Sequence, residues 1–154
     1  KEILIVAKTY PNLSKKYEET VCIAGITNEG EWIRLFPVRF RQLPQDKKFS
    51  KFDIIEADVE KYNDKFMRVE SFKVNNTSIK IKDSIPAPNW DKRKQRLLPK
   101  LANSIEELEE KRNSNHETIG IIKPKEILDF YKKDVDKCRD WEKELAEGTL
   151  QSVS

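Results

Sequence analysis

A cluster of acidic residues is the first place in this sequence where chemistry could occur. The cluster consists of Asp53, Glu56, Asp58 and Glu60, and Lys61 follows it. Carboxylates that converge on one point can hold a divalent metal ion and support nuclease chemistry. In an extended strand the last three acids share one face, whereas Lys61 points to the other. Because no lysine follows an acid by two residues here, as a nuclease strand requires, we interpret the cluster as the solvated face of a strand.

The other residue types needed for catalysis or for holding a cofactor are scarce. The single histidine, His116, lies in a polar stretch beside Asn115 and Glu117. The sequence therefore lacks most of the residues that a histidine-based metal site or a catalytic triad needs. The four glycines are too scattered to form a phosphate-binding loop or a dinucleotide fingerprint. Cys22 and Cys138 lack the spacing of a disulfide framework or a zinc site, and we expect both to be reduced. We therefore expect no catalytic residue, no metal and no cofactor.

A short stretch of alternating residues is the strongest candidate for a binding surface. Trp32, Arg34 and Phe36 alternate with Ile33 and Leu35. If the two aliphatic residues face the core of a strand, the two aromatic rings and the arginine face outward. Single-stranded nucleic-acid binders use this arrangement, in which aromatic rings stack on bases and arginine contacts phosphate. The alternative is that both aromatic rings lie in the core and the aliphatic stem of Arg34 covers them.

Basic residues continue beyond this stretch, at Arg39 and Arg41. Three arginines so close together are costly to bury, which favours a surface. From Arg34 to Lys51 there are six basic residues and one acid, Asp46, which leaves a net charge of +5. We expect Arg34, Arg39 and Arg41 to hold phosphate groups.

A second basic cluster follows Trp90 directly and consists of Lys92, Arg93, Lys94 and Arg96. The surrounding stretch from Lys80 to Lys100 has seven basic residues against two acids, again a net charge of +5. A helix with so many cations can bind phosphates in a salt-dependent way, and Lys92, Arg93 and Arg96 would then extend the binding track. The alternative is a solvated helix face without a ligand.

The chain as a whole has 154 residues, the usual size of one domain. Charged residues make up 37% of it, against roughly 25% in typical soluble domains, and the net charge of +3 implies no partner by itself. No apolar run approaches the roughly 20 residues that span a bilayer, and the apolar stretch at the N-terminus is too short for a signal peptide. We expect a soluble cytoplasmic protein without membrane contact. Because the chain begins with Lys1 rather than Met, we also expect it to be a piece of a longer protein.

Alternating apolar residues and turn signals predict a small antiparallel β-barrel over residues 1–85. The predicted strands are Ile3–Ala7, Thr20–Thr27, Glu31–Phe36, Phe52–Lys61, Phe72–Val74 and Ser78–Ile85. Asn28-Glu29-Gly30 joins the second and third of these strands in a hairpin, with Gly30 where positive φ is needed. Pro37 is expected to end the third strand, and Thr9–Glu19 is expected to be a loop.

Helical periodicity begins after Pro88 and predicts a helical segment over residues 86–154. Helices are predicted at Asp91–Leu98 and Ile105–Arg112, the second opened by a capping box of Ser104 and Glu107. The remaining predicted elements are a strand at Thr118–Ile122, a helical turn at Lys125–Tyr131 and a final helix with Val135, Cys138, Trp141 and Leu145 on one face. The expected fold class is therefore α+β, mainly β, in a single domain.

The hairpin also resembles a known group of sequences. Val21–Ile26, the Glu29-Gly30 turn and Glu31–Pro37 resemble uncharacterised bacterial proteins with dual OB-containing domains, whose pattern runs cysteine, any residue, alanine, glycine, a turn, tryptophan, isoleucine and arginine. The resemblance covers about residues 3 to 40. Leu35 and Phe36 depart from it, because the family pattern has proline soon after the arginine. The resemblance implies a five-stranded OB-like barrel, a fold that often binds single-stranded nucleic acid.

Together these features favour a nucleic-acid-binding module without strong sequence preference, for single-stranded DNA or RNA. Trp32 and Phe36 would stack on bases, while the two basic clusters would hold the phosphates. The alternative is a protein-interaction module, because tryptophan and arginine are also the residues that protein interfaces favour. The predicted final helix, with Trp141, suits that alternative.

Overall fold

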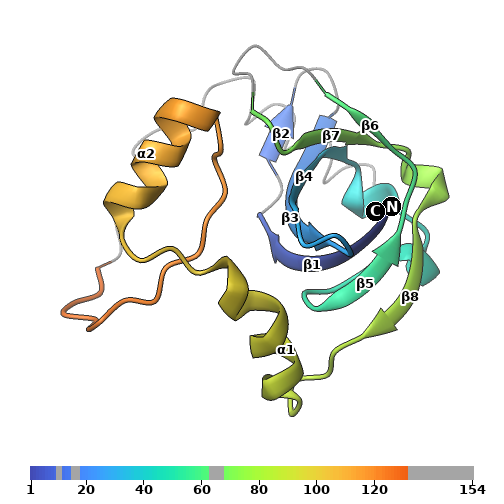
Figure 1. Cartoon of the computed structure of the whole chain (residues 1–154). Coiled ribbons are helices and arrows are strands. Elements are labelled where there is room, and N and C mark those ends of the chain that lie inside the picture. Colours follow the sequence, from blue (N-terminus) through green and yellow to red (C-terminus); the bar gives the residue numbers. More distant parts are fainter. Residues whose placement is uncertain (10–11, 15–17, 63–67, 132–154) are drawn as a thin grey trace.

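The structure is a computed structural model that describes residues 1–9, 12–14, 18–62 and 68–131 (Figure 1). The strands are β1 (Glu2–Lys8), β2 (Asn12–Ser14), β3 (Glu18–Thr27), β4 (Trp32–Val38), β5 (Asp53–Glu56), β6 (Val59–Lys61), β7 (Ser71–Val74) and β8 (Lys80–Ser84). The helices are α1 (Trp90–Leu97) and α2 (Ile105–Asn115), and short 3-10 turns lie at Phe40–Gln42, Gln45–Lys47, Asn76–Ser78 and Leu98–Lys100. The elements expected from the sequence are thus mostly present.

The strands form one mixed sheet that curls into an open half-barrel (Figure 1). Their order is β6-β7-β4-β3-β1-β5-β8, and β2 pairs with β3 beside this path. Among the described strands, β4 and β7 pair in parallel, while the other pairs are antiparallel. The expected mainly β, barrel-like fold is confirmed. The prediction of a purely antiparallel barrel is wrong, because the long connection from β4 to β7 allows a parallel pair that no hairpin could make.

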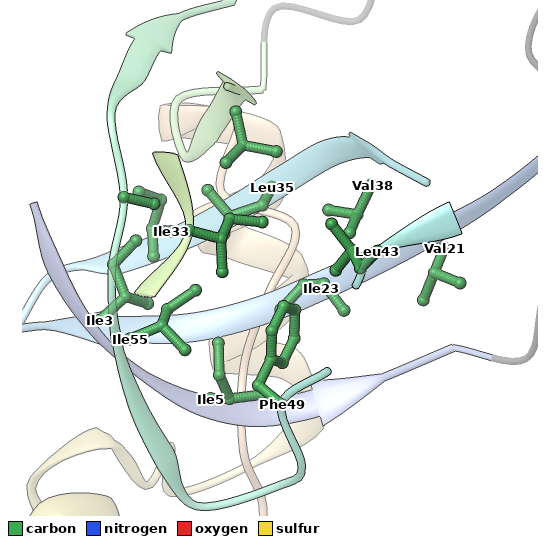
Figure 2. Close-up of a cluster of buried hydrophobic side chains, with 13 residues drawn as sticks. Ile3, Ile5, Val21, Ile23, Ile33, Leu35, Val38, Leu43, Phe49 and Ile55 are labelled. Atoms are coloured by element: carbon green, nitrogen blue, oxygen red, sulfur yellow. The ribbon is translucent and has the colours of Figure 1, made fainter. Parts of the chain in front are cut away.

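The concave side of the half-barrel holds the hydrophobic core (Figure 2). Side chains from β1, β3, β4 and β5 meet there with Leu43 and Phe49 from the connection after β4. Phe49 lies edge-on to the ring of Phe40, with the ring centroids 5.2 Å apart. Ile33 and Leu35 are fully buried in this core, so β4 is fixed with one face inward and one face outward.

The predicted hairpin is confirmed. β3 and β4 pair antiparallel, with Gly25 opposite Ile33 and Ile26 opposite Trp32. Gly30 has φ +80°, the left-handed conformation expected at the end of the turn, and its N–H donates to the carbonyl of Thr27.

Pro37 does not end β4, contrary to expectation. The strand continues to Val38 through a cis Phe36–Pro37 peptide. Val38 pairs with Val21 and Leu35 pairs with Ile23, so β4 has one more residue than β3 between these pairs. Such a bulge tolerates proline, because a residue that makes no ladder hydrogen bond needs no N–H.

The predicted strand Phe52–Lys61 is divided into β5 and β6 by Ala57 and Asp58. β5 pairs with β1 and β8, whereas β6 pairs with β7, so this bent stretch connects the two sides of the curled sheet. Its acidic residues Glu56, Asp58 and Glu60 are exposed, as predicted for a solvated face.

The loop predicted at Thr9–Glu19 contains a strand in its described part. β2 pairs with residues 18–20 of β3. The prediction is wrong here because β3 extends beyond its partner β1, which pairs only with residues 23–27, and the free backbone groups of β3 accept a second strand.

The region after β8 contains the two expected helices. Ser104 caps α2 by accepting a hydrogen bond from the Glu107 N–H at 3.2 Å, which confirms the predicted cap. The predicted strand Thr118–Ile122 is reduced to one parallel bridge between Leu101 and Ile121, and no helical turn forms at Lys125–Tyr131. Residues 118–120 lie against α2 and β4 through Gly120 and Thr118, but they join no ladder of the sheet. The predicted final helix lies outside the described residues.

Gly25 provides a test of the close packing between β1 and β3. A Cβ atom at this position would contact Cγ2 of Ile3 and lie 2.8 Å from the backbone oxygen of Leu4. We expect Gly25→Ala to lower the free energy of unfolding by about 1–3 kcal/mol, because the clash involves backbone. Gly120→Ala is the matched control, since its Cβ would meet only the movable end of the Leu108 side chain. Urea unfolding of both variants measures the difference, and equal stabilities would contradict this packing.

Candidate functional site

The outer face of β4 carries the predicted binding residues. Trp32, Arg34 and Phe36 are half-buried and lie on the face opposite Ile33 and Leu35. The predicted alternation is therefore confirmed, and the two aromatic side chains do not belong to the fully buried core. The segment that follows α2 bonds Arg34 through Thr118, and its residues Glu117 and Ile119 line a cavity together with Trp32.

A buried carboxylate holds that segment against β4. Glu70 is only 4% exposed, and its Oε1 accepts hydrogen bonds from the N–H and the hydroxyl of Thr118. Nη2 of Arg34 donates to Oγ1 of Thr118 at 2.8 Å and lies 3.6 Å from Oε1 of Glu70. The backbone adds a further link, because the N–H of Arg34 donates to the carbonyl of Glu70 at 2.7 Å. The network satisfies Oε1 of Glu70 and orients the guanidinium of Arg34, while Oε2 of Glu70 and Nε of Arg34 are buried without a hydrogen-bond partner.

A cavity of about 560 Å³ opens beside this network. It is lined by Arg34, Arg68, Arg112, Asn113, His116 and Thr118. We call this the cationic cavity, because three guanidinium groups and an imidazole line it and no described lining residue is acidic. Guanidinium groups match the oxygen geometry of carboxylates and phosphates. The lining is therefore suited to bind an oxyanion.

Three separate parts of the chain supply the walls of the cationic cavity. Arg34 comes from β4, Arg68 precedes β7, and Arg112 lies in the last turn of α2. His116 ends α2 in the left-handed conformation, with φ +58°, and its carbonyl accepts from the N–H of Val69 at 3.4 Å. This contact joins the end of α2 to the chain that leads into β7.

The first turns of α2 are fixed by a second carboxylate. Oε1 of Glu107 accepts from Nζ of Lys111 at 2.7 Å, and its Oε2 accepts from the backbone N–H of Asn103 at 2.8 Å. These hydrogen bonds lower the pKa of Glu107 to about 2, and the one from Lys111 has the largest effect. The same interaction raises the pKa of Lys111. The pair therefore stays charged near neutral pH and supports the helix that carries Arg112.

A second cavity, of about 440 Å³, has Glu70 among its lining residues. Its lining includes the aromatic residues Trp32 and Phe72, the cations Lys61 and Lys100, and the acids Glu31, Glu70 and Glu117. We call it the aromatic cavity. Nζ of Lys61 lies 4.7 Å from the centroid of the Phe72 ring. Such a cavity offers an aromatic surface bordered by charges of both signs, on which a flat ring can stack.

The remaining predicted residues lie outside both cavities. Arg39 and Arg41 are exposed just beyond β4, around the turn Phe40–Gln42. Lys92 and Arg96 lie on α1, which ends directly before the turn that carries Lys100 of the aromatic cavity. The structure therefore places the two basic clusters at separate positions rather than in one pocket.

Arg93 packs against the sheet. Its guanidinium lies 4.0 Å from the centroid of the Phe52 ring, and its Nε and Nη2 donate to the carbonyl of Ile85 at 3.0 and 2.6 Å. Its ring contacts also include Trp90, at 5.4 Å. These contacts anchor α1 to the end of the sheet.

Sequence reasoning missed Arg68 and Arg112 as site residues, and it gave His116 no role in binding. No local pattern connects these residues with Arg34, because they lie far from it in the chain and meet only through the fold. The described residues contain no group of three or more histidine, cysteine or acidic side chains that could hold a metal ion. Within the same residues, no helix is long and apolar enough to cross a membrane.

Fold and site together define a small, mainly β domain with an arginine-lined cavity beside the outer face of β4. Residues 1–99 match DUF8758, a domain of unknown function, and the chain belongs to this family. No curated protein and no solved structure matches the chain. The family match includes Arg34 and Arg68 but ends before Arg112 and His116, so one wall of the cationic cavity lies outside it.

Proposed function

We propose that this domain binds single-stranded nucleic acid, without strong sequence preference, along the outer face of β4. The observation that carries the proposal is the cationic cavity, in which three arginines converge and no described lining residue is acidic. Phosphate contacts of this kind supply most of the affinity in sequence-tolerant binding. The aromatic cavity adds the second requirement, an aromatic surface on which a base can stack.

The order of residues along β4 supports a continuous track. Trp32, Arg34 and Phe36 follow one another on the same face, at about 7 Å per step. Arg39 and Arg41 continue the track beyond one end of the strand. At the other end, Lys100 leads from the aromatic cavity to Lys92 and Arg96 on α1, and Arg93 holds that helix in place.

The topology also supports the inference of an OB-like barrel. In an OB barrel the third strand pairs in parallel with the fifth, and the fourth strand bends to pair with both the first and the fifth. β4 and β7 supply the parallel pair, and the bent stretch β5–β6 pairs with β1 and with β7. OB folds bind strands on the face that includes their second and third strands, which here correspond to β3 and β4.

A titration against oligonucleotides tests the proposal. We expect a labelled single strand to bind more tightly than a duplex of the same sequence, because only an unpaired base can enter the aromatic cavity. We also expect affinity to fall steeply between 50 and 200 mM salt, since bound phosphates release counterions. Absence of binding to any oligonucleotide at low salt would contradict the proposal.

Trp32→Ala separates stacking from charge. We expect this change to weaken binding by about 1–3 kcal/mol, the contribution of one stacked base, and to leave the salt dependence nearly unchanged. Trp32→Phe is the matched variant and should retain part of the affinity, because it keeps a ring. If Trp32→Ala unfolds the domain instead, the residue is structural and the stacking role fails; a thermal unfolding curve distinguishes the two results.

A second candidate function is protein binding. Four large apolar residues near the end of the described chain are strongly exposed: Ile127 at 81%, Leu128 at 86%, Phe130 at 89% and Tyr131 at 82%. Exposed clusters of this size often mark protein interfaces. Two results together would favour this alternative. The protein would bind no oligonucleotide, and it would bind a protein partner that Phe130→Ser no longer binds.

A further inference from the structure

We propose that residues 116–121 form a strap that opens and closes over the outer face of the sheet, and that a bound strand holds the strap closed. The strap leads from the end of α2 to the bridge with Leu101, and it runs between the helix and the sheet (Figure 1). This inference rests on the proposed function, because the ligand that favours closure is a single strand. The structure shows the strap closed.

A few hydrogen bonds hold the closed strap against the sheet. At its start, the carbonyl of His116 accepts from the N–H of Val69 at 3.4 Å. In its middle, the N–H of Thr118 donates to Oε1 of Glu70 at 3.1 Å, and the hydroxyl donates to the same oxygen. Nη2 of Arg34 donates to this hydroxyl at 2.8 Å. The position of Thr118 is therefore set by two residues of the sheet side.

Apolar packing adds little to these hydrogen bonds. None of the residues 116–121 is buried, and α2 contains no buried residue either. Ile119 is half-buried and lines a cavity of about 130 Å³ together with Ala24 of β3 and Arg34 of β4. Hydrophobic stabilisation is roughly proportional to the apolar area removed from water. A strap without a buried residue can therefore open while the core stays intact.

The closed state also leaves polar atoms buried without a partner. Within the described part of the chain, these atoms are Nε of Arg34, Oε2 of Glu70 and Oγ of Ser71. A buried polar group without a hydrogen bond costs free energy, which hydration removes. Arg34 and Glu70 are the two residues that hold Thr118, so departure of the strap gives water access to both side chains. This cost opposes closure and makes the open state accessible.

A phosphate in the cationic cavity favours the closed state. The side of α2 and the strap supplies Arg112, His116 and Thr118 to the lining of the cavity, whereas the sheet side supplies Arg34 and Arg68. The complete cavity therefore exists only when the strap is closed. An anion that contacts both sides binds the closed state more tightly, and a ligand shifts an equilibrium towards the state that it binds more tightly.

Amide hydrogen exchange of the full chain, followed by NMR, tests this inference. The N–H groups of Thr118 and Ala102 report on the strap, because the first donates to Glu70 and the second donates to the carbonyl of Ile121 at 2.8 Å. The N–H of Phe52 donates to a carbonyl of β1 at 2.7 Å and reports on the sheet. In the free protein we expect the two strap amides to be protected about 100-fold less than Phe52, because they exchange by local opening.

A single-stranded oligonucleotide should slow the exchange of both strap amides. At a free concentration of about ten times its Kd, we expect the rates to fall about 10-fold, since opening then requires loss of the ligand. A strand that binds the open and the closed states equally would leave these rates unchanged.

Thr118→Val locates the effect, because it removes the hydroxyl and keeps the size of the side chain. Without the two hydrogen bonds of this hydroxyl, we expect the Ala102 N–H to exchange about 10-fold faster in the free protein. Ser114→Ala is the matched control, since the hydroxyl of Ser114 donates to the carbonyl of Glu110 within α2. This control should leave the rate unchanged.

The possible results separate this inference from the proposed function. Equal protection of the strap amides and Phe52 in the free protein would show that the strap opens only with the whole domain, which would overturn the inference and leave the proposed function intact. The inference is also overturned if a strand binds without slowing the strap amides, or if Thr118→Val exchanges no faster than Ser114→Ala. Absence of binding by any strand would overturn both.

Discussion

Glu70→Ala is expected to destabilise the domain by about 2–4 kcal/mol. Glu70 is almost fully buried, and it accepts hydrogen bonds from Thr118 and pairs with the guanidinium of Arg34. Removing one member of such a pair leaves the partly buried arginine without its counter-charge, and it also leaves the N–H and hydroxyl of Thr118 without their acceptor. Chemical denaturation, with the midpoint and slope fitted together, measures the loss.

The matched control is Glu60→Ala. Glu60 is an exposed acid on β6, and its removal changes the net charge by the same amount. We expect it to change the free energy of unfolding by no more than about 0.5 kcal/mol. A loss below about 1 kcal/mol for Glu70→Ala would show that the network does not hold the segment after α2 against the sheet.

Neutralising Arg68 and Arg112 together is expected to have the largest effect on nucleic-acid binding. Hydrogen bonds to charged groups contribute about 1.5–3 kcal/mol each, so the double variant Arg68→Gln, Arg112→Gln should bind a single strand about 100-fold more weakly or worse. Because two phosphate contacts are lost, the dependence of log affinity on log salt should also become shallower by about two units. Arg112 is exposed and Arg68 is partly exposed, so we expect the double variant to fold.

The double variant Lys123→Gln, Lys125→Gln is the control for this experiment. It removes the same total charge from exposed chain beyond the Leu101–Ile121 bridge. Its affinity and salt slope should stay close to those of the unaltered protein. If both double variants weaken binding equally, the effect comes from net charge alone, and the cationic cavity has no special role.

Local patterns in the sequence predicted the part of the fold that depends on neighbouring residues. Alternation placed Ile33 and Leu35 inward and Trp32 and Arg34 outward, and the turn at Gly30 set the pairing of β3 with β4. These features follow from strand geometry and turn chemistry within a few residues. They could therefore be derived without knowledge of the rest of the chain.

The features that could not be predicted depend on contacts between distant segments. The parallel pairing of β4 with β7, and the division of residues 52–61 into β5 and β6, are set by how the sheet curls. The bulge that accommodates Pro37 depends on its partner strand β3. A proline or a run of alternating residues carries no information about such partners.

The candidate site likewise combines a residue that local patterns predict with residues that only the fold brings together. Arg34 was predicted as a binding residue from its place between Trp32 and Phe36, but its neighbours in the cavity were not. Arg112 and His116 reach Arg34 because Thr118 is bound by the buried Glu70, and nothing in the local sequence distinguishes Glu70 from the many exposed acids. The role of a charged residue in a buried network becomes visible only in three dimensions.

Chemical-shift mapping with a single-stranded oligonucleotide tests the central claim most directly. The Nε–H signal of Arg112 reports on the cationic cavity, and the indole N–H of Trp32 reports on the aromatic cavity. We predict that both signals shift in a saturable way at low salt, and that both return towards their free positions as salt is added. The claim that this face of β4 binds nucleic acid would be contradicted if both signals stayed in place at a saturating oligonucleotide concentration. It would also be contradicted if only the signals of the exposed segment Ile127–Tyr131 shifted.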